Sequence, residues 1–176
     1  MLKKYLRLLL LLMGVFFLVL VGMVFLPTQQ CLELTDYKTQ QKIGCFPLEK
    51  NQVFVISYTH SVNKGRVKDF YQVYDNQLYI TKTRFVSYGA GIPEPEEGEN
   101  FVAFDDYFEI QDINRHIPVL LVAVGVIANH GVELNNSVIY LKDFIPVQTQ
   151  VVFTVKKTSA LHLGCNNLLK NISTVN

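Results

Sequence analysis

The stretch from Val53 to Tyr74 alternates between apolar and polar residues, and this alternation constrains the fold more than any other feature. One face of its first half carries Phe54, Ile56, Tyr58, His60 and Val62. The second half alternates in the same way, and the residues Asn-Lys-Gly-Arg at 63–66 are typical of a short turn. A period of two is that of a strand with one buried face. The stretch therefore predicts an antiparallel hairpin.

A turn centred between Lys64 and Gly65 sets the predicted register of this hairpin. It places His60 opposite Asp69 on the apolar face. Two interpretations of this pair are open: a site with an oriented imidazole that acts as acid, base or ligand, or a buried pair whose members satisfy each other. Ser61 follows His60 directly and points to the opposite face, so it cannot complete a catalytic triad with His60 without a bulge.

A second turn at Asp75-Asn76 predicts a third strand over residues 77–88. If the loop of this turn has two residues, Lys82 falls opposite Asp69 and brings a cation beside the His60–Asp69 pair. A single bulge would move Lys82 out of this position.

The third strand ends in Ser-Tyr-Gly-Ala-Gly-Ile-Pro, which predicts a turn with unusual backbone angles. Gly89 and Gly91 permit such angles and could form an amide-lined hollow that binds an anion. The alternative is a turn without a ligand. The candidate residues for binding a ligand or partner are His60, Ser61, Asp69, Lys82, Gly89 and Gly91. No residue is assigned a catalytic role.

The amino-terminal segment predicts a membrane anchor. Residues 1–7 contain Lys3, Lys4 and Arg7, and Leu8 to Leu26 is an uncharged apolar run. As a helix this run is about 28 Å long, enough to cross a bilayer core. The positive charges place residues 1–7 in the cytoplasm and the rest of the chain outside it. A cleaved signal peptide is the rival interpretation, but no small-x-small cleavage site precedes Thr28.

Two cysteines near the anchor predict a disulfide. Cys31 and Cys45 lie in two short apolar segments, and a turn centred on Lys38 would set them against each other. Outside the cytoplasm such a pair can oxidise, and closing this loop would contribute about 3 kcal/mol. The alternative is two half-buried thiols, and Cys165 is left without a partner.

The remaining chain predicts further strands and no soluble helix. Short apolar segments separated by turn residues favour an all-β domain over residues 31–157, an antiparallel β-sandwich or barrel, followed by a weakly patterned tail at 158–176. The net charge of +1 and the scattered basic residues argue against a nucleic-acid partner. No Cys–His spacing is typical of a zinc site, so the sequence predicts no metal and no cofactor.

Three short motifs carry a resemblance to a known family. Tyr-Thr-His-Ser-Val at 58–62, Val-x-Asp at 67–69 and Gly-Ala-Gly-Ile-Pro at 89–93 resemble a bacterial family of uncharacterised domains, and the resemblance extends over about residues 32–155. Members are typically encoded beside TAXI-type TRAP transporters, which pair an extracytoplasmic solute-binding protein with a membrane permease. The family commonly has an acidic residue where Asn63 stands and Glu where Asp69 stands. The resemblance implies a setting and no reaction.

We therefore expect a single-pass, extracytoplasmic accessory protein of a solute transport system. It would contact the lipid bilayer through Leu8 to Leu26, and it would bind the TRAP permease, the TAXI-type solute-binding protein or a small ligand without catalysis. One alternative is a membrane-anchored hydrolase or metal-dependent enzyme that uses His60 and Asp69. Another is a structural protein of the cell envelope.

Overall fold

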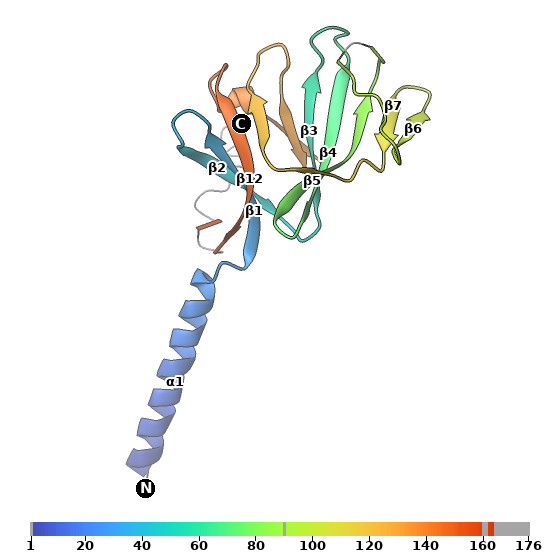
Figure 1. The fold of residues 1–176 in the computed structure, drawn as a ribbon. Helices are drawn as coiled ribbons and strands as arrows, with labels where there is room; N and C mark the ends of the chain where they lie inside the picture. The colour runs from blue at the N-terminus through green and yellow to red at the C-terminus, as the bar shows by residue number, and fades with distance from the viewer. Residues whose placement is uncertain (1, 90, 160–161, 164–176) are drawn as a thin grey trace.

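A long apolar helix leads into a β-rich domain in the computed structural model, which describes residues 2–89, 91–159, 162 and 163 (Figure 1). Helix α1 (Leu2–Phe25) projects away from the domain, and its segment Lys3–Phe25 buries none of its surface against the rest of the chain. This segment is long and apolar enough to cross a membrane. It fits a single-pass anchor or a signal sequence.

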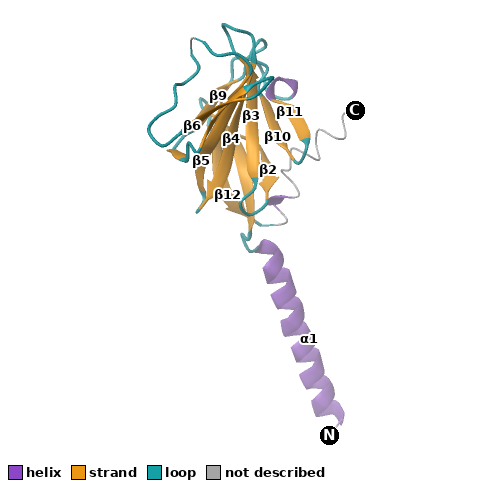
Figure 2. Ribbon diagram, turned by 90° about the vertical axis from the view of Figure 1, so that its right-hand side faces the viewer, coloured by secondary structure: helices purple, strands orange, loops and turns teal. Residues whose placement is uncertain are grey.

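The domain consists of antiparallel strands in two sheets. The strands are β1 (Gln29–Asp36), β2 (Lys42–Leu48), β3 (Val53–Thr59), β4 (Arg66–Tyr74), β5 (Gln77–Phe85), β6 (Asn100–Ala103), β7 (Phe108–Gln111), β8 (Arg115–Ile117), β9 (Leu120–Ala123), β10 (Gly131–Leu134), β11 (Ser137–Tyr140) and β12 (Gln150–Thr158). The four-stranded sheet has the order β2-β1-β12-β9, and the eight-stranded sheet has the order β11-β10-β3-β4-β5-β7-β6, with β8 also paired to β5. This sandwich-like arrangement confirms the predicted antiparallel β architecture (Figure 2).

The main core lies between the two sheets. Alternate residues of β1 and β12, such as Leu32 and Phe153, face Phe54 and Ile56 of β3 and are almost fully buried. A second, smaller cluster joins Val67, Phe85, Ile92 and Ile110, with Tyr58 packed against it. Burial of one face per strand is what the period-two pattern dictates, because every second side chain points inward.

The predicted register of the β3–β4 hairpin is wrong. Thr59 pairs with Arg66, so six residues form the loop, and Asp69 pairs with Ile56. His60 lies in the loop, where its amide donates to the carbonyl of Gly65 at 2.8 Å. Relative to the predicted pairing, the partner of each β3 residue moves by an even number of positions along β4. The same side chains therefore stay on the buried face. The alternation alone therefore could not distinguish the two registers.

The predicted position of Lys82 opposite Asp69 is also wrong, because β5 contains the bulge that the sequence left open. A bulge separates the pairs Phe70↔Lys82 and Tyr71↔Ile80. The extra residue, Thr81, turns Lys82 to the outer face of the sheet and sets Thr83 opposite Asp69.

The predicted pairing of the first two strands differs by two positions. Cys31 pairs with Pro47, and Cys45 pairs with Glu33. The two cysteines are thus diagonal neighbours on adjacent strands. The predicted tail is described only in part, because residues 160–161 and 164–176, Cys165 among them, lie outside the described residues.

Candidate functional site

The loops at the strand ends remote from α1 form one surface, which we call the distal tip. It consists of residues 60–65, 86–89, 91–92, 124–130 and 144–149. β1 begins beside the end of α1 and rises through eight residues, or about 26 Å, toward this tip (Figure 1). The tip and the apolar helix therefore occupy opposite ends of the molecule.

His60 is a buried residue of the tip. Its side chain is 7% exposed, and Nδ1 accepts hydrogen bonds from the amides of Val62 at 3.3 Å and Asn63 at 3.5 Å. Because Nδ1 is an acceptor, the neutral ring carries its proton on Nε2. The imidazole therefore stabilises the loop after β3.

Gly91 lies against the imidazole of His60. A Cβ atom at position 91 would stand 2.9 Å from Nε2, and Gly91 has a φ of 88°, which side chains rarely adopt. The amide of Ile92 donates to the carbonyl of Gly89 at 3.1 Å, which directs Ile92 into the second core cluster. The structure thus brings the predicted residues His60 and Gly91 together, although they are far apart in sequence.

Two further contacts join the same loops. The side-chain amide of Asn63 donates to the carbonyl of Ser87 at 2.9 Å, and its Oδ1 accepts from the amide of Gly65 at 2.9 Å. Gly65 packs so closely on Val86 that a Cβ atom would stand 2.5 Å from its Cγ2. Two motifs of the predicted resemblance therefore form one folded unit.

Asp69 lies below the tip, on the inner face of the eight-stranded sheet. Its Oδ1 accepts a 2.6 Å hydrogen bond from the hydroxyl of Thr83. Burial raises the pKa of the Asp69 carboxyl, and the Thr83 hydrogen bond opposes this rise. Burial, with a smaller contribution from Asp69, raises the pKa of Tyr58 to about 12 and raises the pKa of Tyr71 as well.

The partner of Asp69 is thus Thr83 and not the predicted His60. The strand register does not set the imidazole of His60 opposite the Asp69 carboxylate, because His60 lies beyond the end of β3. Within the described parts of the chain, no group of three or more His, Cys, Asp and Glu side chains could hold a metal ion.

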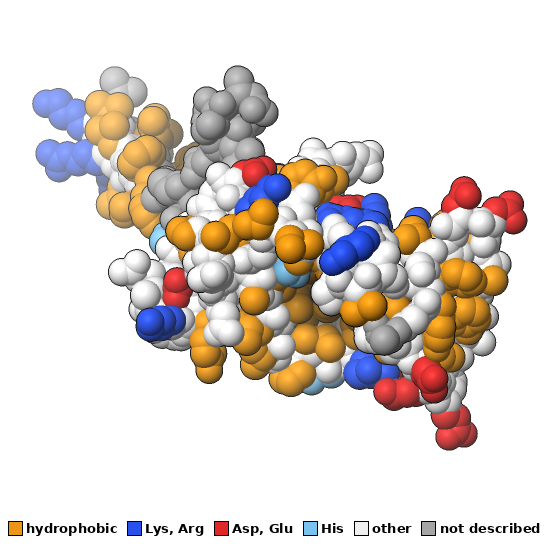
Figure 3. Space-filling view, turned by 90° about the horizontal axis from the view of Figure 1, so that it is seen from above, with side chains coloured by type: hydrophobic (Ala, Val, Ile, Leu, Met, Phe, Trp, Pro, Cys, Tyr) orange, Lys and Arg blue, Asp and Glu red, His pale blue; other side chains and the backbone are white. Residues whose placement is uncertain are grey.

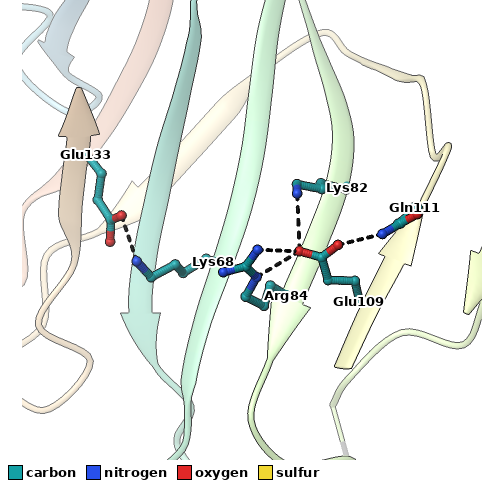
Figure 4. Close-up of polar contacts among 6 residues, drawn as sticks. All are labelled: Lys68, Lys82, Arg84, Glu109, Gln111 and Glu133. Carbon is teal, nitrogen blue, oxygen red and sulfur yellow. Dashed lines mark hydrogen bonds and ion pairs between the residues drawn. The ribbon is translucent and has the colours of Figure 1, made fainter. Parts of the chain in front are cut away.

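Lys82 belongs to a polar network on the outer face of the same sheet (Figure 4). Glu109, only 2% exposed, accepts from Lys82 at 3.1 Å, from Nη2 of Arg84 at 2.7 Å and from Gln111 at 2.6 Å. Burial alone would raise the pKa of Glu109, but the hydrogen bonds from Gln111, Arg84 and Lys82 outweigh it and lower the pKa. Arg84 also lies 4.0 Å above the ring of Tyr107.

This network was missed by sequence reasoning. The signal available was the alternation of Lys82 and Arg84 on one face of β5, opposite the short apolar segment that contains Glu109. A separate ion pair joins Lys68 and Glu133 across β3 at 2.8 Å (Figure 4).

Arg66 connects the sheet to the tip and was also missed. Its guanidinium donates to the buried hydroxyl of Ser57 at 2.7 Å and to the carbonyl of Asn129 at 3.0 Å. The amide of Thr59 donates to the carbonyl of Ala128 at 2.7 Å. These bonds hold residues 124–130 in one arrangement beside the loop after β3.

An apolar groove of about 410 Å³ opens between these two loops. Its walls are Val124, Gly125, Val126, Ile127, Ala128 and Val147, and its polar lining residues are Thr59, Ser61, Lys64 and Gln148. Val126 and Ile127 are 62% and 71% exposed. Hydrophobic side chains are spread over the face of the domain seen from this end (Figure 3). Exposed aliphatic side chains on loops held in place are typical of a binding surface.

Cys31 and Cys45 lie outside the tip. Both are buried free thiols, and they lie on adjacent strands. The interaction between the two thiols and burial raise the pKa of Cys31, whereas the same interaction lowers the pKa of Cys45 to about 7.

Comparison with known proteins assigns the domain to a family. No curated protein and no solved structure matches the chain. The family described as "Domain of unknown function (DUF1850)" matches residues 54–141, which is half of the 176-residue chain. The match runs from β3 to the end of β11 and includes both His60 and Gly91. The predicted resemblance to an uncharacterised domain family is thereby confirmed, and the chain belongs to the DUF1850 family.

Proposed function

We propose that this chain is a membrane-anchored, extracytoplasmic accessory protein of a TRAP-type solute transport system. In this role α1 holds the domain at the membrane, and the distal tip binds a transport component, either the permease or the TAXI-type solute-binding protein. The chain acts by binding and not by catalysis.

The observation that carries this proposal is the position of the tip. His60 and Gly91, from two motifs of the resemblance, meet in the distal tip, which also contains the exposed apolar groove. The apolar helix leaves the opposite end of the domain (Figure 1). A protein tethered at one end and apolar at the other is suited to contact a partner beyond the membrane surface.

The geometry supports binding better than hydrolysis. An enzyme that used His60 and Asp69 would need both side chains to reach one substrate. Here Nδ1 of His60 accepts backbone amides, and Asp69 accepts from Thr83 in a strand register that separates it from the loop. The transport setting rests on the resemblance, and the binding surface rests on the geometry.

Affinity purification of the full chain from detergent-solubilised membranes tests the proposal. We expect the wild-type chain to capture the permease or the solute-binding protein, identified by mass spectrometry. Ile127→Ser should lose it, because Ile127 is exposed in the groove and contributes little to folding. Val138→Ser changes an aliphatic residue that is 46% exposed on β11 and should retain the component. Equal capture by both variants, or no transport component with the wild-type chain, would refute the proposal.

A further inference from the structure

The eight-stranded sheet has an open edge at β6, on the right-hand side of Figure 1. Among the described strands, β6 pairs with β7 alone, and three of its four residues are exposed. An open edge presents backbone N–H and C=O groups with which another extended chain can pair. The edge is therefore a possible place for a partner strand to add to the sheet.

Exposed aromatic side chains lie on both faces of this edge. On the inner face, Phe101 pairs with the buried Ile110, and its ring lies 5.9 Å from that of Tyr88. On the outer face, Phe104 stacks on Tyr107 at 4.5 Å, beside the Lys82–Arg84–Glu109 network. The rings of Tyr88, Phe101 and Phe104 are all exposed. Aromatic side chains are enriched in protein interfaces, where they supply a large contact area.

Acidic residues flank β6 at both ends. Residues 85–114 contain eight of the 15 acidic residues of the chain and none of its 16 Lys and Arg residues. Four of these carboxylates are exposed and have no ion-pair partner within the described parts of the chain: Glu94 and Glu97 before β6, and Asp105 and Asp106 after it. Figure 3 shows hydrophobic side chains at the right-hand end of the domain with acidic side chains on either side of them.

These features favour a partner that is extended and basic. Carboxylates at both ends of β6 attract Lys and Arg side chains, and they repel a second acidic edge. Pairing of β6 with the β6 of another copy is therefore disfavoured. Between the charged ends, β-branched side chains fit beside aromatic rings on a neighbouring strand.

We propose that β6 binds an extended segment of a partner protein, in which a short run of β-branched residues lies between Lys or Arg residues. The segment pairs with the backbone of β6 and packs on Phe101 and Tyr88. Its basic residues contact Glu94 and Glu97 at one end and Asp105 and Asp106 at the other. This surface borders the distal tip at Tyr88 and shares no residue with the apolar groove, so the inference does not rest on the proposed function.

Fluorescence anisotropy tests the inference with the full chain in uncharged dodecyl maltoside micelles and peptides that carry an uncharged dye. The peptide KKVTVTVKK places alternating valine and threonine between pairs of lysines. EEVTVTVEE reverses its charge, and KKVTPTVKK contains a proline that removes a backbone donor from the middle of the strand. We expect both control peptides to bind at least about tenfold more weakly than KKVTVTVKK. Binding of either control as tight as that of KKVTVTVKK would overturn the proposal.

Variants of the chain test the two kinds of contact separately. Glu94→Gln/Asp105→Asn/Asp106→Asn removes three carboxylates beside β6 and should weaken the binding of KKVTVTVKK at least about tenfold. Tyr88→Ser removes an exposed ring and should also weaken it. Both variants change exposed side chains, so their thermal unfolding should stay cooperative. Wild-type affinity in either variant would contradict the proposed contacts.

Matched variants control for general charge and for the loss of any exposed ring. Glu49→Gln/Asp75→Asn/Asp143→Asn removes the same number of exposed carboxylates away from β6 and should bind the peptide as the wild type does. Tyr74→Ser removes an exposed ring at the end of β4 and should have no effect on binding. Equal losses in these variants and in those beside β6 would show that the peptide does not bind at β6.

Hydrogen exchange with mass spectrometry locates the peptide. KKVTVTVKK should protect the amides of β6 and leave those of β11, the opposite edge of the same sheet, unprotected. Equal protection of both edges would overturn the proposal. Protection of β6 that rises with protein concentration in the absence of peptide would assign the edge to a second copy and also overturn it. Ile127→Ser in the tip groove should bind the peptide normally, so failure at the groove and failure at β6 are distinguishable.

Discussion

The imidazole of His60 lies against the backbone of Gly91, so closely that a methyl group at position 91 would stand 2.9 Å from Nε2. This contact joins the loop after β3 to the loop after β5 in the distal tip, although the two residues are 31 positions apart in the sequence. A side chain at position 91 is unfavourable for two separate reasons, contact with His60 and a φ of 88°. This makes the contact accessible to a simple mutational test.

Gly91→Ala should destabilise the domain by about 1–3 kcal/mol, because it introduces both backbone strain and a clash with His60. Gly89→Ala is the matched control, since a Cβ atom there would meet nothing within 4 Å. Its effect should stay within about 1 kcal/mol. Urea denaturation measures both. His60→Ala/Gly91→Ala should recover part of the loss by removing the clash. Equal destabilisation by the two single glycine variants would contradict the contact.

The hydrogen bond from Thr83 to Asp69 predicts a pH-dependent cost for its removal. Thr83→Val keeps the shape of the side chain and removes a donor to a carboxylate. Above the raised pKa of Asp69, where the carboxyl is ionised, this should cost about 1.5–3 kcal/mol, and less below that pKa, where the carboxyl is neutral. Thr81→Val is the control, because Thr81 donates to the neutral carbonyl of Phe70 at 3.2 Å. Its cost should not change with pH.

Asp69→Asn tests the raised pKa of Asp69 itself. Because the pKa is higher in the folded state, the folded protein binds a proton at Asp69 more tightly than the unfolded chain does. The contribution of Asp69 to stability is therefore greatest below its unfolded-state pKa and declines as pH rises through its folded-state pKa. The difference in unfolding free energy between the wild type and Asp69→Asn should move in favour of the variant over this range. A constant difference would show that the pKa of Asp69 is not raised.

The sequence predicted which residues of the β3–β4 hairpin face inward but not which residues pair. Alternation shows the face of a residue, and Phe54, Ile56 and Val67 are buried as predicted. Registers that preserve this face are equivalent by that criterion. The six-residue loop is closed by backbone bonds between His60 and its neighbours, which the alternation does not encode. The prediction that His60 and Asp69 pair was therefore wrong.

The bulge at Thr81 depends on contacts that are distant in sequence. Its carbonyl accepts from the amide of Ile113 at 3.0 Å, and its hydroxyl donates to Phe70. The alternation of residues after the Asp75-Asn76 turn contains no information about a hydrogen-bond partner at position 113, so it could not predict the bulge. The contact between His60 and Gly91 is of the same kind. Both residues were named from the sequence, and only the fold shows that they meet.

The buried carboxylate of Glu109 should be important for stability. Glu109→Gln removes the charge that Lys82 and Arg84 share, and their side chains remain one-third exposed at 32% and 33%, so water compensates in part. We expect a loss of about 1.5–3 kcal/mol in urea denaturation. Glu96→Gln breaks an ion pair with Arg115 at a side chain that is 67% exposed and should change stability by less than about 0.5 kcal/mol. Similar losses in the two variants would contradict this assignment.

Anchoring by α1 predicts that the two ends of the molecule lie on opposite sides of the membrane. Ile127→Cys at the tip should react with a membrane-impermeant maleimide in intact cells. Lys3→Cys should react only after permeabilisation. Cys165→Ser provides the background, and the native Cys31 and Cys45 are buried. Labelling of Lys3→Cys in intact cells, or a mature chain that lacks residues 1–26, would contradict the anchor.

The last prediction concerns the thiols of Cys31 and Cys45. They are diagonal neighbours on β1 and β2 and both are buried, so little movement separates them from a disulfide. If the domain lies outside the cytoplasm, we expect the Cys31–Cys45 bond in protein isolated without reductant and with free thiols blocked during lysis. It would close a loop of 15 residues and stabilise the fold by about 3 kcal/mol relative to the reduced chain. Mass spectrometry of non-reduced peptides detects the link, and Cys165→Ser excludes exchange with the third cysteine. Two alkylated thiols in this variant would show that the pair remains reduced.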